Sequence, residues 1–137
     1  MAKILIIEDN PENMKLATLL LSNLGHAALC AVDAETGLTQ ARTCEPELIL
    51  MDIQLPGMDG FAATRILKSD PVTASIPIIA LTAMAMKEDQ EKSRVAGCDG
   101  YIAKPLRYKE LYAAINALLS RRAGQKIDST IDSDLGN

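Results

Sequence analysis

The segment Leu48-Ile49-Leu50-Met51-Asp52 places a carboxylate directly after four large apolar residues. Three other apolar runs also end at polar residues: 4–7 before Glu8-Asp9, 76–81 before Thr82, and 101–103 before Lys104. Short, continuous apolar runs separated by helical patterns are typical of buried parallel strands. Because parallel strands all end at the same edge of a sheet, we expect these polar side chains to meet in one crevice.

The pattern around these runs alternates between strand and helix five times. We expect strands at about 3–8, 27–32, 47–52, 77–82 and 100–103, and helices at about 12–24, 34–43, 60–69, 86–96 and 107–121. Because crossovers between parallel strands are right-handed, this order predicts an α/β fold with an open, doubly wound parallel sheet and helices on both faces. We assign residues 1–121 to this domain, and the polar, aperiodic residues 122–137 to a flexible C-terminal tail.

Composition narrows the classes of function. The chain has 137 residues, of which 48% are hydrophobic, as expected for one packed domain. Its net charge of -4 argues against a nucleic-acid partner. Three scattered cysteines suit a reducing compartment. No apolar stretch approaches the roughly 20 residues of a membrane span, and the first strand starts too early to leave room for a signal peptide. We therefore expect a cytoplasmic protein without a membrane partner.

The carboxylates at the strand ends predict a metal site. Like charges this close repel each other unless a cation lies between them. Mg²⁺ suits the position because it takes a few carboxylates, a carbonyl and several waters in octahedral geometry. We expect Asp9 and Asp52 as direct ligands, the backbone carbonyl of Gln54 as a third, and the longer Glu8 acting through a metal-bound water.

Asp52 is also placed to act as a nucleophile toward phosphorus. Carboxylates form aspartyl-phosphate intermediates, and the protein then positions the group and neutralises its charge. Lys104 would contact one phosphoryl oxygen, and the Thr82 hydroxyl would donate a hydrogen bond to another. We expect a cis bond before Pro105, which would direct Lys104 inward.

Four motifs together resemble the receiver domain of two-component response regulators, of the CheY-like superfamily. They are Ile7-Glu8-Asp9-Asn10, residues 51–60 (Met-Asp-Ile-Gln-Leu-Pro-Gly-Met-Asp-Gly), Ala80-Leu81-Thr82-Ala83 and Tyr101-Ile102-Ala103-Lys104-Pro105. The residue sequences of these motifs are most similar to those of DivK-type single-domain regulators and of the receivers of hybrid histidine kinases. The resemblance extends over residues 1–121 and implies the flavodoxin-like strand order 2-1-3-4-5.

The resemblance further implies how such a domain signals. A phosphoryl group would pass from a histidine kinase or a histidine phosphotransfer protein to Asp52, with Mg²⁺ as cofactor. Thr82 would then move toward the phosphate and Tyr101 would turn inward as the switch residues. Together they would repack the fourth helix, fifth strand and fifth helix, roughly residues 86–109, which would bind a downstream effector protein. The domain would catalyse only its own phosphorylation and dephosphorylation, and we expect no output domain after residue 121.

Other interpretations of the sequence stay open. The chain could be a receiver excised from a hybrid histidine kinase. An Mg²⁺-dependent phosphohydrolase is disfavoured because Gln54 stands where an acid would help most. A flavodoxin-like cofactor carrier is disfavoured because Glu8-Asp9 would repel phosphate without a metal. His26, the single histidine, is not expected to be the phosphodonor. We also expect the apolar Met84 to slow loss of the phosphoryl group.

Overall fold

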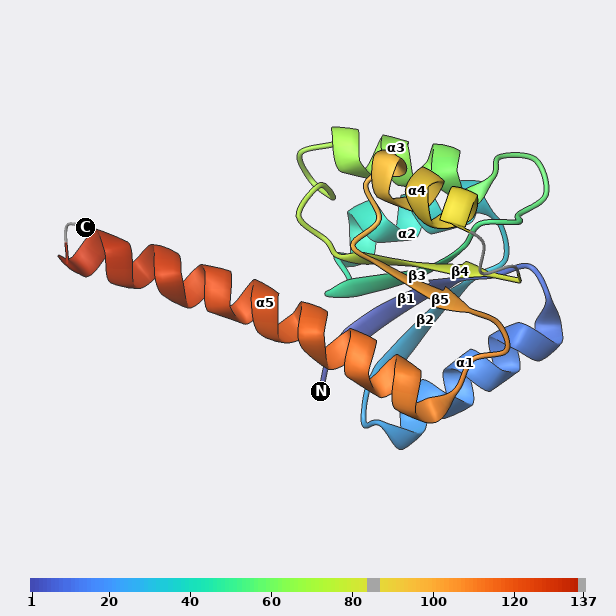
Figure 1. Cartoon of the computed structure of the whole chain (residues 1–137), viewed down its shortest axis with the longest axis horizontal. Helices are drawn as coiled ribbons and strands as arrows, with labels where there is room; N and C mark the ends of the chain where they lie inside the picture. Colours follow the sequence, from blue (N-terminus) through green and yellow to red (C-terminus); the bar gives the residue numbers. More distant parts are fainter. Residues whose placement is uncertain (84–86, 136–137) are drawn as a thin grey trace.

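The computed structural model describes residues 1–83 and 87–135, with side chains described as far as Arg121. In these residues, five strands alternate with five helices (Figure 1). The strands are β1 (Lys3–Ile7), β2 (Ala27–Ala31), β3 (Leu48–Asp52), β4 (Ile78–Thr82) and β5 (Gly100–Ala103). The helices are α1 (Pro11–Asn23), α2 (Ala34–Cys44), α3 (Gly60–Ser69), α4 (Lys87–Ala96) and α5 (Tyr108–Leu135).

The strands form one parallel sheet in the order β2-β1-β3-β4-β5, which confirms the predicted topology. The register aligns the carboxyl ends of the three central strands, since Ile7 pairs with Met51 and Asp52 pairs with Leu81. Residues that follow β1 and β4 therefore lie beside the end of β3. This alignment creates the predicted polar edge.

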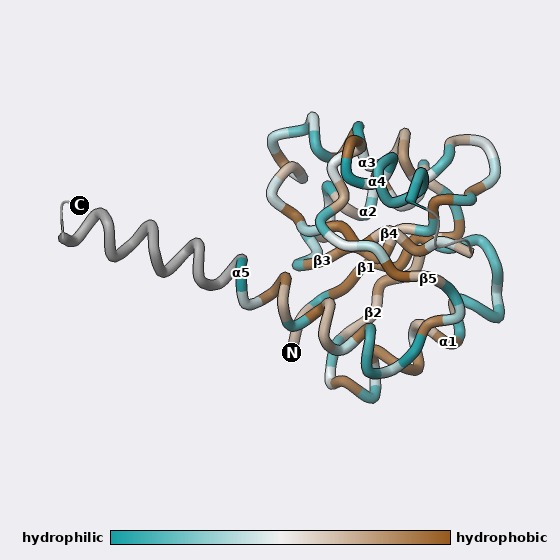
Figure 2. Tube along the Cα trace, in the orientation of Figure 1, coloured by the Kyte–Doolittle hydropathy of each residue, from teal (hydrophilic) through white to brown (hydrophobic). Residues whose placement is uncertain are grey.

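Two apolar layers hold the sheet between helices. Alternate residues of each strand point to opposite faces, as the two-residue period of a strand requires. Ile4, Ile6, Leu48 and Leu50 pack with residues of α1 and α5, whereas Leu5, Ile7, Ile49 and Met51 pack with α2 and α3. Figure 1 shows α1 and α5 on one side of the sheet, and α2, α3 and α4 on the other. The hydrophobic colouring in Figure 2 is concentrated along the strands between these layers.

Side-chain caps start three helices close to the strand ends. Asn10, Asp33 and Asp59 accept hydrogen bonds from the backbone N–H groups of Asn13, Thr36 and Ala62, respectively. Such caps satisfy N–H groups that a helix leaves without partners in its first turn. As a result, α1 and α3 begin within eight residues of the strands that carry the acidic side chains.

The last helix is longer than the sequence predicts. We expected it to end near residue 121, but the backbone of α5 continues as a helix to Leu135 (Figure 1). Polar residues predominate after 121, which favoured a tail, but Ile127, Ile131 and Leu135 recur at the four-residue spacing of a helix. The flexibility of residues 122–137 stays a prediction. No helix in the described residues is long and apolar enough to cross a membrane.

Truncation of the central strand should destabilise the domain strongly. Leu50 is fully buried in β3. Leu50→Ala should lower the free energy of unfolding by about 2–5 kcal/mol, because it removes buried methyl groups and leaves a cavity. Leu19→Ala is the matched control, since Leu19 is 57% exposed on α1, and should change stability by less than about 0.5 kcal/mol. Urea unfolding followed by circular dichroism measures both; equal losses would contradict the two-layer core.

Candidate functional site

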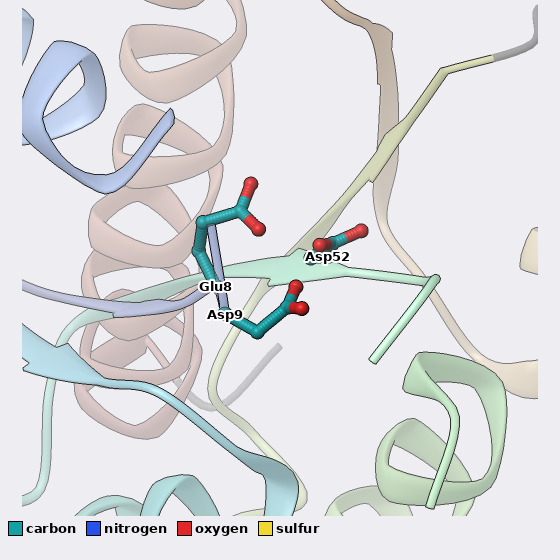
Figure 3. A group of neighbouring side chains, drawn as sticks. All are labelled: Glu8, Asp9 and Asp52. Carbon is teal, nitrogen blue, oxygen red and sulfur yellow. The ribbon is translucent and has the colours of Figure 1, made fainter. Parts of the chain in front are cut away.

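Three carboxylates gather where β1 and β3 end. Glu8 and Asp9 directly follow β1, and Asp52 is the last residue of β3. One ligand oxygen from each carboxylate lies within 4.8 Å of the others. Figure 3 shows the three groups turned toward a common space. The structure thus brings together the acidic residues that the sequence predicts.

Lys104 brings a positive charge to this cluster from the end of β5. Its Nζ lies 2.7 Å from Oε1 of Glu8 and 3.2 Å from Oδ2 of Asp52. The backbone N–H of Lys104 donates to the carbonyl of Thr82 at 2.6 Å, which ties the end of β5 to the end of β4. The Lys104–Pro105 bond is cis, as predicted. Lys104 therefore reaches Asp52 across β4, and Glu8 across both β4 and β3.

The buried Glu8 is the most strongly perturbed carboxyl group in the cluster. Burial, together with a hydrogen bond shared with Asp52, raises the pKa of Glu8 to about 7. Its Oε2 accepts a hydrogen bond from the backbone N–H of Asn10 at 3.2 Å. Oε1 meets Lys104 as an ion pair, but no donor among the described residues meets it with hydrogen-bond geometry. Burial thus disfavours the charged form of Glu8, even beside Lys104.

Asp52 lies in a setting that keeps it ionised. Burial favours the neutral acid of Asp52. Three interactions outweigh this effect and lower the pKa of Asp52: a hydrogen bond with Glu8, the hydrogen bond from the Gln54 N–H, and the charge of Lys104. The Gln54 N–H donates to Oδ1 at 2.9 Å. Burial likewise opposes the charge of Lys104, yet its close contact with Glu8 and the charge of Asp52 raise the pKa of the ammonium group. Asp52 and Lys104 therefore form an ion pair that faces Glu8.

These donors fit a hard divalent cation. The cluster offers carboxylate oxygens alone, which Mg²⁺ prefers to nitrogen or sulfur ligands. Glu8 Oε1 is buried without an aligned hydrogen-bond donor, and burial raises the pKa of Glu8, so that added positive charge would favour its ionised form. A cation bound here would supply that charge. The cluster is therefore typical of a magnesium site.

The predicted switch residues lie beside this cluster on the neighbouring strands. Thr82 is buried at the end of β4, next to β3. Tyr101 is half-buried in β5, where it pairs with Ala80. Their movements stay predictions. Met84, expected to affect phosphoryl loss, and Met86, at the start of the predicted effector face, lie outside the described residues.

Two features of the site were missed by the sequence analysis. We expected Glu8 to act through metal-bound water, and did not expect its direct ion pair with Lys104. We also gave no role to Gly60, which lies against the Asp52 peptide. Gly60 entered the sequence analysis only as the last residue of the motif 51–60 and as the start of a predicted helix. No local signal marks either contact, since each joins elements that are distant in the sequence.

The fold and the acidic cluster define a class of phosphoacceptor domains, and comparison with known proteins shows the family. Residues 4–116 match the response regulator receiver domain, so this chain belongs to that family of two-component signalling proteins. It is 41% identical over 116 residues to the polar-differentiation response regulator DivK of Brucella anthropi, a match that covers 85% of this chain and 94% of that protein. The DivK of Brucella ovis matches with the same identity and coverage.

Solved receiver structures agree with this assignment. The receiver domain of a sensor histidine kinase from Pseudomonas aeruginosa superimposes with a TM-score of 0.81 at 34% identity, covering 87% of this chain and 98% of that one. Its structure has a magnesium ion coordinated in the active-site cleft. A response regulator from Chloroflexus aurantiacus gives a TM-score of 0.84 at 28% identity, with the same coverage.

Family membership establishes the general function. The chain carries a receiver domain like DivK, and its pocket of Glu8, Asp9 and Asp52 is consistent with a phosphorylation site. A receiver domain implies a histidine kinase as partner and is generally not a true enzyme.

Without metal, the stability of the domain should fall as pH rises from about 4.5 to 7. In this window the unfolded chain releases the Glu8 proton, whose ordinary pKa is 4.5, while the folded protein retains it up to its pKa of about 7. The unfolded state is therefore favoured progressively, by about 3 kcal/mol at most. Urea unfolding at a series of pH values in the presence of chelator measures this slope.

Glu8→Gln is the variant that isolates the effect. The amide cannot titrate, so its stability should lack the fall between pH 4.5 and 7. His26, whose pKa burial lowers, acts in the opposite direction but is present in both proteins. Asp52 titrates below its ordinary value of 3.8, outside this window. Identical slopes for the wild type and Glu8→Gln would show that Glu8 does not hold the proton.

Proposed function

We propose that Asp52 accepts a phosphoryl group from a phosphohistidine of a partner protein, and that this domain works as a phosphorylation switch. The single observation that carries the proposal is the pairing of a buried, ionised Asp52 with Lys104 at 3.2 Å. In the reaction, a carboxylate oxygen of Asp52 forms a bond to phosphorus while the phosphorus–nitrogen bond of the donor breaks. The released imidazole nitrogen keeps the electron pair of that bond.

We propose that the acidic cluster holds Mg²⁺. Asp9, Asp52 and the backbone carbonyl of Gln54 would be direct ligands, with Glu8 in contact through a metal-bound water. When bound, the ion would neutralise the carboxylates and the incoming phosphoryl oxygens. Support comes from the three carboxylates within 4.8 Å of one another and from the magnesium in the related Pseudomonas structure.

Lys104 would change partners during the transfer. Its Nζ contacts Glu8 and Asp52 before the reaction, and would then bind one oxygen of the phosphoryl group. A fixed ammonium aimed at developing negative charge lowers the barrier, because the site needs no reorganisation at that moment. The hydroxyl of Thr82, at the end of the next strand, would donate to another phosphoryl oxygen.

The α4-β5-α5 face would be the surface that binds the effector protein. We propose that Thr82 moves toward the phosphate and that Tyr101 turns inward, so that this face repacks and binds an effector protein. Support comes from the hydrogen bond between the ends of β4 and β5, which joins Thr82 to Lys104, and from the exposed apolar Val95 and Tyr108 on α4 and α5. The same chemistry holds if the domain is part of a hybrid histidine kinase. A cytoplasmic location stays a prediction.

Phosphorylation should be observed directly with acetyl phosphate as donor. Intact-protein mass spectrometry should record one added phosphoryl group that depends on Mg²⁺ and is absent from Asp52→Asn. Asp33→Asn is the matched control: Asp33 also follows a strand, but it caps α2 and lies outside the acidic cluster. An adduct on Asp52→Asn, or no adduct on the wild type even with beryllofluoride as a trap, would refute the proposal.

Lys104→Met should separate metal binding from catalysis. Removal of the ammonium group frees the oxygens of Glu8 and Asp52, so the affinity for Mg²⁺ in isothermal titration calorimetry should rise. Phosphorylation at saturating Mg²⁺ should slow by about 100-fold, as when one charge-stabilising donor is lost. Lys92→Met makes the same change on the exposed surface of α4 and should leave both quantities unchanged. Equal phosphorylation rates for the two variants would exclude a catalytic role for Lys104.

A further inference from the structure

Helix α3 begins in unusually close contact with the peptide of the proposed phosphoacceptor. A Cβ atom at Gly60 would lie 2.4 Å from the carbonyl oxygen of Asp52 and 2.5 Å from Cα of Ile53. Both atoms belong to the backbone, so neither can rotate away. Gly60 is not among the glycines with positive φ, and the contact is therefore what excludes a larger residue.

The same contact closes the loop that carries Gln54. The backbone N–H of Gly60 donates to the carbonyl of Ile53 at 3.2 Å, so residues 54–59 form a loop closed at its base. At the start of this loop, the Gln54 N–H donates to Oδ1 of Asp52 at 2.9 Å. The backbone N–H of Ile53 donates to the carbonyl of Leu81 at 3.1 Å. This hydrogen bond joins the residue before the loop to β4.

A buried hydroxyl bonds to the first residue of α3. Thr64, which is fully buried on α3, donates from Oγ1 to the carbonyl of Gly60 at 2.7 Å. The Sγ atom of Cys98 lies 3.8 Å from Oγ1 of Thr64 and links that hydroxyl to the segment before β5. The first turn of α3 thus contacts the backbone of Asp52 and Ile53 on one side. On the other side, Thr64 connects it to Cys98.

We infer, on the basis of the proposed phosphorylation of Asp52, that Gly60 is a positioning residue for the phosphoryl-transfer site and that Thr64 supports it. Gly60 contacts no reacting atom. It sets how closely α3 approaches β3, and so fixes the Gln54 peptide, which supplies a hydrogen bond to Asp52 and the proposed carbonyl ligand. A methyl group at Gly60 would displace these backbone atoms by about 1 Å, a misplacement that can cost roughly 100-fold in rate.

The test compares Gly60→Ala with Gly37→Ala. A Cβ at Gly37 would also lie 2.4 Å from another atom, but the atoms that it meets, Cδ1 at 2.4 Å and Cγ1 at 2.7 Å, belong to the side chain of Ile7 and not to the backbone. Both variants should lose stability. Gly60→Ala alone should weaken Mg²⁺ binding in calorimetry, and slow phosphorylation by acetyl phosphate at saturating Mg²⁺ by at least about tenfold, because only it moves the Gln54 peptide.

A second pair of variants applies even if Gly60→Ala does not fold. Thr64→Val removes the hydroxyl without changing the size of the side chain, and should shift both readouts in the same direction by a smaller factor. Thr64→Ser keeps the hydroxyl and should restore values near those of the wild type. A Thr64→Val variant with wild-type binding and rate would overturn the supporting role of Thr64.

The outcomes distinguish this inference from the proposed function. If the wild type is phosphorylated while Gly60→Ala and Gly37→Ala have equal Mg²⁺ affinities and rates, Gly60 serves packing alone and the inference is wrong. If the wild type itself neither binds Mg²⁺ nor accepts a phosphoryl group, the proposed function fails, and the positioning role fails with it.

Discussion

Electrostatic repulsion among three carboxylates at one edge of the sheet is the constraint on which the rest of the structure depends. Glu8, Asp9 and Asp52 place donor oxygens within 4.8 Å of one another, and two of these side chains are buried. Burial removes the water that would screen their charges. Lys104 provides part of the compensation, while burial and the neighbouring Asp52 raise the pKa of Glu8 to about 7. Carboxylates gathered in this way are typical of a magnesium site in a receiver domain.

Such a cluster needs a rigid frame, and the sheet supplies one. Apolar residues of β1 and β3 pack against helices on both faces, so the strand ends that carry Glu8 and Asp52 cannot drift apart. The hydrogen bond from Lys104 to the Thr82 carbonyl joins the next two strand ends to the same edge. Fixed charges in a water-poor site act on a reacting group without the cost of reorganisation. The hydrophobic layers therefore fix the relative positions of the charged side chains at this edge of the sheet.

Much of the fold followed from local patterns. The apolar run before Asp52 marked β3 because four large apolar residues in succession suit a strand covered on both faces. The helix expected at about 12–24 agrees closely with α1, which spans Pro11–Asn23. The end of α5 was misplaced because polar residues predominate beyond 121 and the four-residue spacing of Ile127, Ile131 and Leu135 was overlooked, although the backbone is helical to Leu135. The strand order came from resemblance to a family rather than from pattern.

The sequence by itself determined the donor set: carboxylates after β1 and β3, a hydroxyl after β4 and an ammonium group after β5, all at one edge of a parallel sheet. Only the tertiary structure decided that Lys104 pairs with Glu8 as well as Asp52, and that Gly60 rests on the Asp52 peptide. The physical reason is distance along the chain. Residue type and spacing fix which groups reach the edge, because strands and helices have short periods. The packing of elements far apart in sequence fixes which atoms finally touch.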